Sequence, residues 1–321
     1  MKKLIVTSTD DKFSIGCALL LYSLSKNMSI FGDCDVKVLY TNLSQENKNL
    51  IKRVCPKVVF ETPKNFDYCK GIKTLYGDSN QDTYLCLEAF KESDYDRVAY
   101  IDTDMLCIGD ISDIFSEQLD YSIMACAGTK SINKNPTHYK HGISKFNAGF
   151  IVIGKENLKN SKTYNDLIWL VENAKNTKQG NYYRVLHKKS LTFNDQDAIK
   201  IYWQKRPVFI LPDWYNFKNF GHGPKEQDFK KTDDIFRENL KNIKIIHYSG
   251  KRKPWANKTD RSGPSIGGKP PGSYDVCSVA DPEEMNKSLA MHMWHEYYEE
   301  CFGEKCMNDW YKHDRTMVWE K

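Results

Sequence analysis

The sequence predicts an α/β fold, in which a mostly parallel sheet carries helices on both faces and a helical extension follows at the C-terminus. Short β-favouring runs alternate with amphipathic helical runs over the first hundred residues. Polar residues follow several of these runs, at the strand ends where an open parallel sheet binds its ligands. The length of 321 residues is enough for one large α/β domain with a smaller C-terminal addition.

The first hundred residues supply the alternation. We expect strands over 2–9, 34–42, 56–63 and 97–101, and helices over 14–27, 44–54 and 83–93. The first helix is indicated by helical spacing, because Ile15, Leu19, Leu20 and Leu24 fall on one side of it. Ser44 is placed to cap the second helix.

The pattern is less regular after residue 104. We expect strands over 121–128, 145–156, 206–212 and 242–250, and helices over 158–176, late in 191–204, and over 282–302. Asn194 or Asp195 can cap the middle helix, and Gly149 can form a bulge in its strand. Residues 260–275 are rich in Gly, Pro and Ser and predict an exposed loop.

Composition excludes several classes of protein. The formal net charge of +5 is spread along the chain and does not indicate nucleic-acid binding. No apolar run reaches the length of a transmembrane segment, and the N-terminus does not resemble a signal peptide. We therefore expect a cytoplasmic protein whose ten cysteines are reduced thiols.

Two carboxylates follow the predicted strand 97–101. Asp102 and Asp104 stand two positions apart, and the apolar run resumes at Met105. Residues two apart in an extended chain point the same way, so both carboxylates can face one cation, and their oxygens suit Mg²⁺ or Mn²⁺. Burial is expected to raise the pKa of both, a penalty that a cation removes. A polar turn after a strand is the alternative, since a motif this short recurs by chance.

A second cluster stands at the end of the strand 242–250. His247 offers an imidazole nitrogen, a third ligand well matched to Mn²⁺. Gly250 permits the close approach of backbone to a ligand, and the basic run 251–253 places positive charge nearby, as a phosphate site requires. Ordinary surface structure at a strand end is the alternative.

A third cluster joins two short segments, "FNAGF" at 146–150 and "NDQD" at 194–197. Asn147 and Gln196 are uncharged hydrogen-bonding groups of the sort that hold sugar hydroxyls. Asp195 and Asp197 add carboxylates. A helix cap explains part of the second segment equally well, without excluding a role in a site.

Four segments, taken in order, resemble a known family. "YIDTDMLCIGDISDIF", "FNAGF", "FNDQDAIKIYW" and "HYSGKRKPW" are similar to the motifs of the family-eight retaining glycosyltransferases, which include glycogenin and the bacterial lipopolysaccharide α-galactosyltransferases. The resemblance extends from the first strand to about Trp255. It implies a Rossmann-like A-type glycosyltransferase fold, with a nucleotide-sugar-binding catalytic domain over 1–258 and a flexible loop and helical extension over 259–321.

The resemblance also implies an activity and a set of site residues. The protein would move a hexose from a UDP-sugar to an acceptor, with Mn²⁺, or Mg²⁺ in its place, bridging the diphosphate. The metal ligands would be Asp102, Asp104 and His247. The nucleoside would be held by Thr7, Thr9, Asp10 and Phe13, with Thr103 near the ribose. Gly250 and Lys253 would meet the diphosphate, Asn147 the donor sugar, and Asp195 and Gln196 the region of the anomeric carbon.

The chain departs from the family pattern at three positions. The family usually has Tyr where Phe13 stands, which keeps a stacking ring but loses a hydroxyl. It usually has Arg or Lys where Cys86 stands, and commonly an Asp near Gly128. The latter two departures leave the identity of the donor sugar open.

The sequence leaves several alternatives for the reaction. Retention can follow from attack on the same face as the departing diphosphate, or from a double displacement in which Asp195 is the nucleophile; Gln196 is too weak a nucleophile for that route. A metal-dependent UDP-sugar hydrolase and a degenerate nucleotide-sugar-binding protein are the competing functions. The acceptor can be a glycan, a protein or a lipid, and a homodimer is also open.

Overall fold

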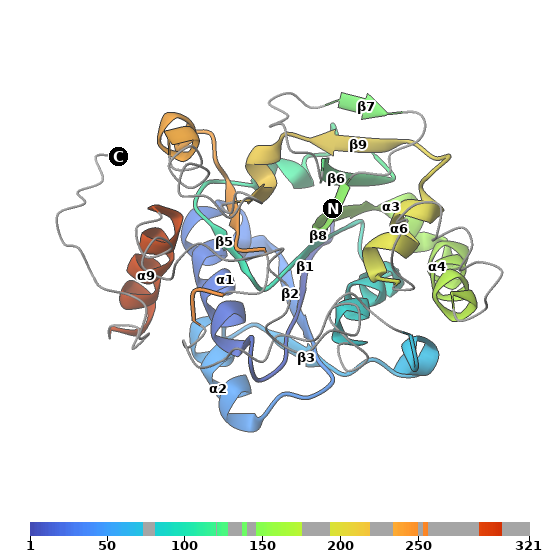
Figure 1. Ribbon diagram of the computed structural model, residues 1–321, viewed down its shortest axis with the longest axis horizontal. Coiled ribbons are helices and arrows are strands. Elements are labelled where there is room, and N and C mark those ends of the chain that lie inside the picture. The colour runs from blue at the N-terminus through green and yellow to red at the C-terminus, as the bar shows by residue number, and fades with distance from the viewer. Residues whose placement is uncertain are drawn as a thin grey trace, which may run out of the picture.

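The structure is a computed structural model (Figure 1). It describes residues 1–72, 81–119, 121–127, 137–139, 146–174, 193–218, 234–249, 253–255 and 289–303. The α/β class predicted from the sequence is confirmed, because a central sheet carries helices against both of its faces.

The central sheet has eight strands in the order β3-β2-β1-β4-β8-β6-β9-β7. The strands are β1 (Lys3–Ser8), β2 (Asp35–Leu39), β3 (Val59–Glu61), β4 (Arg97–Ile101), β6 (Ile123–Ala127), β7 (Thr137–Tyr139), β8 (Phe146–Gly154) and β9 (Val208–Leu211). The first four strands in this order are parallel, and β8 runs antiparallel between β4 and β6. Every residue of β4, which belongs to the parallel part of the sheet, is buried, as expected for a strand covered on both faces.

A second, small sheet positions the candidate site. It consists of β10 (Phe217–Lys218), β11 (Ile245–His247) and β5 (Met105–Cys107). β11 pairs antiparallel with β5, and His247 lies opposite Met105 in the register. This pairing brings the end of a late strand next to the segment that follows β4.

Helices cover the two faces of the central sheet with separate apolar cores (Figure 1). On one face, α1 (Ser14–Asn27) and α2 (Gln45–Val54) pack around Ile5 of β1. On the other, the 3-10 helix η3 (Gln81–Lys91), α4 (Ser161–Asn173) and α6 (Asp195–Tyr202) pack around Leu4 and Val6. The alternation of β1 side chains between the two cores is the period-two pattern of a strand buried on both sides.

The remaining helices complete the fold. The terminal helix α9 (Leu289–Phe302) packs through Trp294 in a third core that includes Leu19 of α1. α3 (Lys155–Lys159) leads into α4, and the short 3-10 turns are η1 (Phe31–Asp33), η2 (Phe66–Cys69), η4 (Ser112–Phe115) and η5 (Asp213–Asn216). The predicted helical extension is thus present over 289–302, and residues 282–288 lie outside the described part.

Local signals set several element ends as predicted. The Ser44 hydroxyl accepts from the backbone N–H of Asn47 at 3.3 Å and caps α2. Asn194, rather than Asp195, caps α6, and its backbone N–H donates to the Asp197 carboxylate at 3.0 Å. The register against β6 shifts at β8 around Gly149, which is the expected bulge.

The structure differs from prediction at the helix expected over 83–93. This segment is a 3-10 helix, η3, and not an α-helix. Its side chains from Tyr84 to Phe90 are all buried, because η3 lies between the sheet and α4. The exposed loop expected over 260–275 lies outside the described residues.

All eight cysteines in the described part of the chain are free thiols, and Cys277 and Cys306 lie outside it. Among the described helices, none has the length and apolar character that crossing a membrane requires.

Candidate active site

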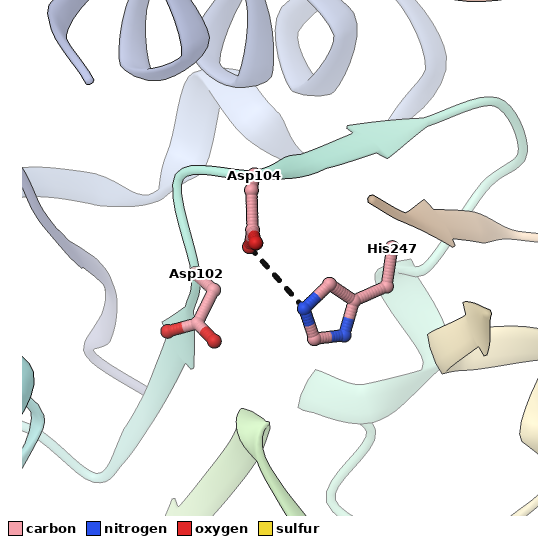
Figure 2. Close-up of side chains that lie close together, drawn as sticks. All are labelled: Asp102, Asp104 and His247. Carbon is pink, nitrogen blue, oxygen red and sulfur yellow. Dashed lines mark ion pairs between the residues drawn. The ribbon is translucent and has the colours of Figure 1, made fainter. Parts of the chain in front are cut away.

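The chain turns sharply where β4 ends. Strand pairing stops after Ile101, and the Asp102 backbone N–H donates to the Gly149 carbonyl at 2.8 Å. Thr103 and Asp104 form a turn, after which β5 begins. The two carboxylates were expected to face one cation from an extended chain; they come together by a turn instead. Figure 2 shows the Asp104 carboxylate directed toward the His247 ring, with the Asp102 carboxylate beside it.

The three predicted metal ligands converge. One ligand atom each from Asp102, Asp104 and His247 lies within 4.8 Å of the others. His247 Nε2 is 3.2 Å from Asp104 Oδ1 (Figure 2). His247 is 3% exposed and Asp104 9% exposed, while Asp102 is half-buried. Two carboxylates and one imidazole on this scale form a group that can hold a single divalent ion.

A hydrogen-bond chain fixes the orientation of the imidazole. The backbone N–H of Gly149 donates to Asn147 Oδ1 at 3.0 Å, so this atom must be the amide oxygen. Asn216 therefore approaches it with Nδ2, at 2.8 Å, and presents Oδ1 to His247 Nδ1 at 2.8 Å. Nδ1 must then carry a proton, which leaves Nε2, on the side of the carboxylates, as the ring nitrogen that a metal would take.

Gln196 belongs to the same network. The backbone N–H of Ala148 donates to Gln196 Oε1 at 3.0 Å, and Asn147 Nδ2 donates to it at 3.3 Å. With its oxygen held by two donors, Gln196 can offer a substrate only its Nε2 hydrogens. Asn147, expected to touch the donor sugar, uses both amide atoms within the protein and links Gln196 to Asn216.

Gly149 of the "FNAGF" segment has no room for a side chain. A Cβ built on it would collide with Asp102 Oδ2 and lie 3.0 Å from both Asn147 Oδ1 and His247 Cε1. Glycine is therefore required here by the approach of β8 to the three convergent ligands.

The pKa values of the two carboxylates are shifted in opposite directions. Burial, followed by the charge of Asp104, raises the pKa of Asp102 to about 7. Burial also acts to raise the pKa of Asp104, but the Lys253 ammonium and His247 outweigh it and hold this pKa well below its usual range. The expectation that both pKa values rise is thus wrong for Asp104, because a lysine far away in sequence lies beside it.

Lys253 supplies that positive charge. Its Nζ forms an ion pair with Asp104 Oδ2 and donates to the Tyr248 carbonyl at 3.0 Å. It also lies 5.7 Å from the centre of the Phe13 ring, and Trp255 contacts the same ring edge-on with centroids 5.6 Å apart. The predicted nucleoside platform and the predicted phosphate ligand are therefore neighbours. Gly250 lies outside the described residues.

Asp195 stands at the start of α6. The Cys86 thiol donates to its Oδ2 at 3.2 Å, and burial raises the pKa of Asp195 to about 6. Cys86, noted as a departure from the family pattern, thus contacts a predicted catalytic residue directly. Gly128, the other departure, lies outside the described residues.

The predicted nucleoside ligands line the end of β1. The Asp10 carboxylate accepts from the Phe13 backbone N–H at 2.9 Å and so fixes the turn that precedes α1, and the Thr9 hydroxyl donates to the Asp10 carbonyl at 3.1 Å. Thr7 is buried, and its hydroxyl has no partner among the described residues. Thr103 is buried between Asp102 and Asp104. Their role toward a nucleoside stays a prediction.

Sequence reasoning missed Asn216. It lies in η5, in a segment without periodicity or a recognisable motif, and acts on the site through His247. Nothing in the sequence alone distinguishes it from the other polar residues of loops.

This fold is that of the A-type glycosyltransferases. An active-site mutant of LgtC matches with a TM-score of 0.56 and 18% identity, over 92% of this chain and 95% of that one. The bifunctional glycosyltransferase WbbM matches with a TM-score of 0.56 and 19% identity, over 92% and 51%. The galactosyltransferase LgtC with donor and acceptor sugar analogues matches with a TM-score of 0.50 and 20% identity, over 79% and 90%. At 18–20% sequence identity, these similarities show a shared fold only.

The sequence profile of Glycosyl transferase family 8 matches residues 4–259. The chain belongs to this family, which confirms the resemblance seen in its motifs and supports a glycosyl transfer function. No curated protein matches the chain.

Proposed function

We propose that the protein is a retaining glycosyltransferase that moves a hexose from a UDP-sugar to a hydroxyl acceptor, with Mn²⁺ bridging the donor diphosphate. The observation that carries this proposal is the convergence of Asp102, Asp104 and His247, with ligand atoms within 4.8 Å, beside the Lys253 ammonium. Membership of Glycosyl transferase family 8 supports glycosyl transfer as the reaction.

The residues present suit a divalent ion. Two carboxylates and an imidazole match Mn²⁺, and the carboxylates also suit Mg²⁺. His247 Nδ1 is held by Asn216, which leaves Nε2 for the metal, the usual arrangement of a ligating histidine. The raised pKa of Asp102 fits too, because a carboxylate that is partly removed from water and lies beside Asp104 is unfavourable without a cation.

Each group has a separate task in the reaction. Bound Mn²⁺ would act as a Lewis acid that stabilises negative charge on the departing diphosphate. Lys253 carries a fixed positive charge for the same diphosphate, and Asp104 holds this charge in place. The Gln196 amide donates toward the sugar, since its oxygen is engaged.

Retention by same-face attack is the route that these contacts favour. A nucleophilic Asp195 would need a free carboxylate, whereas its Oδ2 accepts from Cys86 and burial favours the protonated form. In same-face attack the departing phosphate oxygen takes the acceptor proton, so no protein base is required.

The other assignments complete the proposal. Thr7, Thr9, Asp10, Phe13 and Thr103 hold the nucleoside, and Gly250 the diphosphate. Residues 1–258 form the catalytic domain, which the end of the family match at residue 259 supports. The free thiols of the described cysteines support a reducing, cytoplasmic location.

A donor panel tests this function. UDP-glucose, UDP-galactose, UDP-N-acetylglucosamine and UDP-xylose are incubated with Mn²⁺, and released UDP is measured. We expect release from at least one donor, loss with a chelator, and a decrease of a hundredfold or more in Asp104→Asn. Asp94→Asn is the matched control, because Asp94 is exposed and away from the site.

Two results would contradict the proposal. No UDP binding in the presence of Mn²⁺ would exclude a UDP-sugar as the donor. UDP release that no sugar in an acceptor panel accelerates would favour the competing function, a UDP-sugar hydrolase.

A further inference from the structure

Two lysines that form no ion pair with any described residue stand beside the candidate site. Lys200 lies on α6 and Lys218 ends β10, and both are half-buried. In the part of the chain that the structure describes, neither forms an ion pair or a hydrogen bond. A half-buried ammonium without a partner is unfavourable, and lysines are seldom buried unless paired. Two such groups together therefore suggest a ligand.

Lys218 is placed by strand register. It lies opposite His247 in the parallel pair of β10 and β11, and the preceding pair is Phe217 with Ile246. The latter two side chains are buried together in the core under α9. Successive side chains of a strand alternate between faces, so Lys218 and His247 share the other face, which is the face of the predicted metal ligands.

Lys200 is placed by helix spacing. It follows Gln196 by four residues on α6, and residues four apart lie on one side of a helix. Gln196 reaches Asn147 and Ala148 of β8, so the side of α6 that carries Lys200 is the side turned toward the site. Burial lowers the pKa of Lys200, Asp197 and Asp195 act to raise it, and the charge of Lys218 acts to lower it, so the two ammonium groups lie within electrostatic range of each other.

The pair is separate from the expected diphosphate site. Lys253 forms an ion pair with Asp104, whereas Lys218 forms none, and among carboxylates its charge interacts most with Asp213 and then with Asp102. Lys200 is acted on by Asp197 and Asp195, beside the expected anomeric carbon. On the proposed function, Gln196 lies beside the anomeric carbon that the acceptor hydroxyl must reach, and Lys200 shares its side of α6, so an anionic group held there would belong to the acceptor.

We propose that Lys200 and Lys218 bind an anionic group, a phosphate or a carboxylate, on the acceptor substrate. This inference rests on the proposed function, and it narrows the acceptor to an anionic molecule. The lysines fix the position of the acceptor by charge, and the hydroxyl to be glycosylated lies on the part of the acceptor that faces Gln196. A neutral glycan lacks the group that these two charges need.

The experiment separates the two proposals in its first step. UDP binding with Mg²⁺, in place of paramagnetic Mn²⁺, is measured by calorimetry on the wild type, Lys200→Met, Lys218→Met and Lys205→Met. Lys205 is exposed just past α6 and is the matched control. We expect all four proteins to bind UDP; a wild type that does not bind it contradicts the proposed function and not the role of the lysines.

The second step titrates three acceptor probes into the UDP complex by ligand-observed NMR. Glucose 6-phosphate and methyl glucuronide are expected to bind at least tenfold more tightly than methyl glucoside. The preference disappears in Lys200→Met and Lys218→Met and persists in Lys205→Met. Lys200→Gln and Lys218→Gln, which keep a polar group, are expected to lose it as well, and they replace the methionine variants if those fail to fold.

Three results would overturn the inference. One is equal binding of the neutral and anionic probes to the wild type. Another is an equal loss in Lys205→Met, which would indicate a general charge effect. The third is a preference for UDP-glucuronate over UDP-glucose that Lys200→Met abolishes, since it would assign the anionic group to the donor sugar.

Discussion

Replacing either carboxylate of the site by its amide is expected to have opposite effects on the metal-free protein. Asp102 is destabilising when ionised, because burial raises its pKa from 3.8 to about 7. The difference of about 3 pH units corresponds to about 4 kcal/mol at most, at about 1.4 kcal/mol per unit. Asp102→Asn removes this cost, so the metal-free variant should unfold at a higher urea concentration at pH 8.

The stability gained by Asp102→Asn is expected to depend on pH. Between pH 3.8 and about 7, folded Asp102 keeps a proton that the unfolded chain has lost, so wild-type stability decreases as the pH rises through this window. Asp102→Asn lacks this slope. The gain in the free energy of unfolding should be near zero at pH 4 and largest above pH 7.

Asp104→Asn serves as the opposite case. Its pKa is lowered by Lys253 and His247, so the ionised form stabilises the folded state above pH 3.8, and this contribution is lost as the pH falls. The amide leaves Lys253 without its ion-pair partner and should destabilise the protein at pH 8.

Urea unfolding with a chelator present, followed by tryptophan fluorescence at pH 4, 6 and 8, measures both variants. Added Mn²⁺ should raise the midpoint of the wild type alone. An Asp102→Asn variant that is folded yet less stable than wild type at pH 8 would refute the reasoning.

Three further changes test the surroundings of the site, each by calorimetric titration with Mn²⁺. Lys253→Met should raise Mn²⁺ affinity about tenfold without UDP, because it removes a competing cation, and lower it with UDP present; no change without UDP would contradict the competition. Asn216→Ala should weaken Mn²⁺ binding about 10- to 100-fold, because His247 loses its orienting partner; unaltered binding would show that the orientation has another cause. Gly149→Ala should abolish Mn²⁺ binding, because its Cβ would collide with the ligands. Gly32→Ala, with open space around it, should bind Mn²⁺ normally. Equal Mn²⁺ affinities of the two variants would show that the side chains of the site move to accommodate the added Cβ.

The regular elements were predictable where the sequence has a clear period. The run 97–101 is apolar after Arg97 and forms β4, and the helix 14–27 has the predicted bounds. The 3-10 geometry of η3 was not predictable, because its burial pattern suits either kind of helix. β8 was predicted as a strand, but its antiparallel place between β4 and β6 depends on long-range pairing that periodicity does not report.

The candidate site was predictable in its residues and not in its geometry. Asp102 and Asp104 stand out because carboxylates rarely end an apolar run, and His247 follows from the family motif. Their convergence depends on the pairing of β5 with β11 across about 140 positions of sequence. The charge of Lys253 on Asp104 and the role of Asn216 arise only from that convergence.

The most direct test of the account is the position of the metal. Crystals grown with UDP and Mn²⁺, measured at the manganese absorption edge, should give one anomalous peak at bonding distance, about 2 Å, from Asp102, Asp104 and His247 Nε2. A peak elsewhere, or ordered UDP with no peak between these three side chains, would contradict the metal site and the transfer reaction built on it.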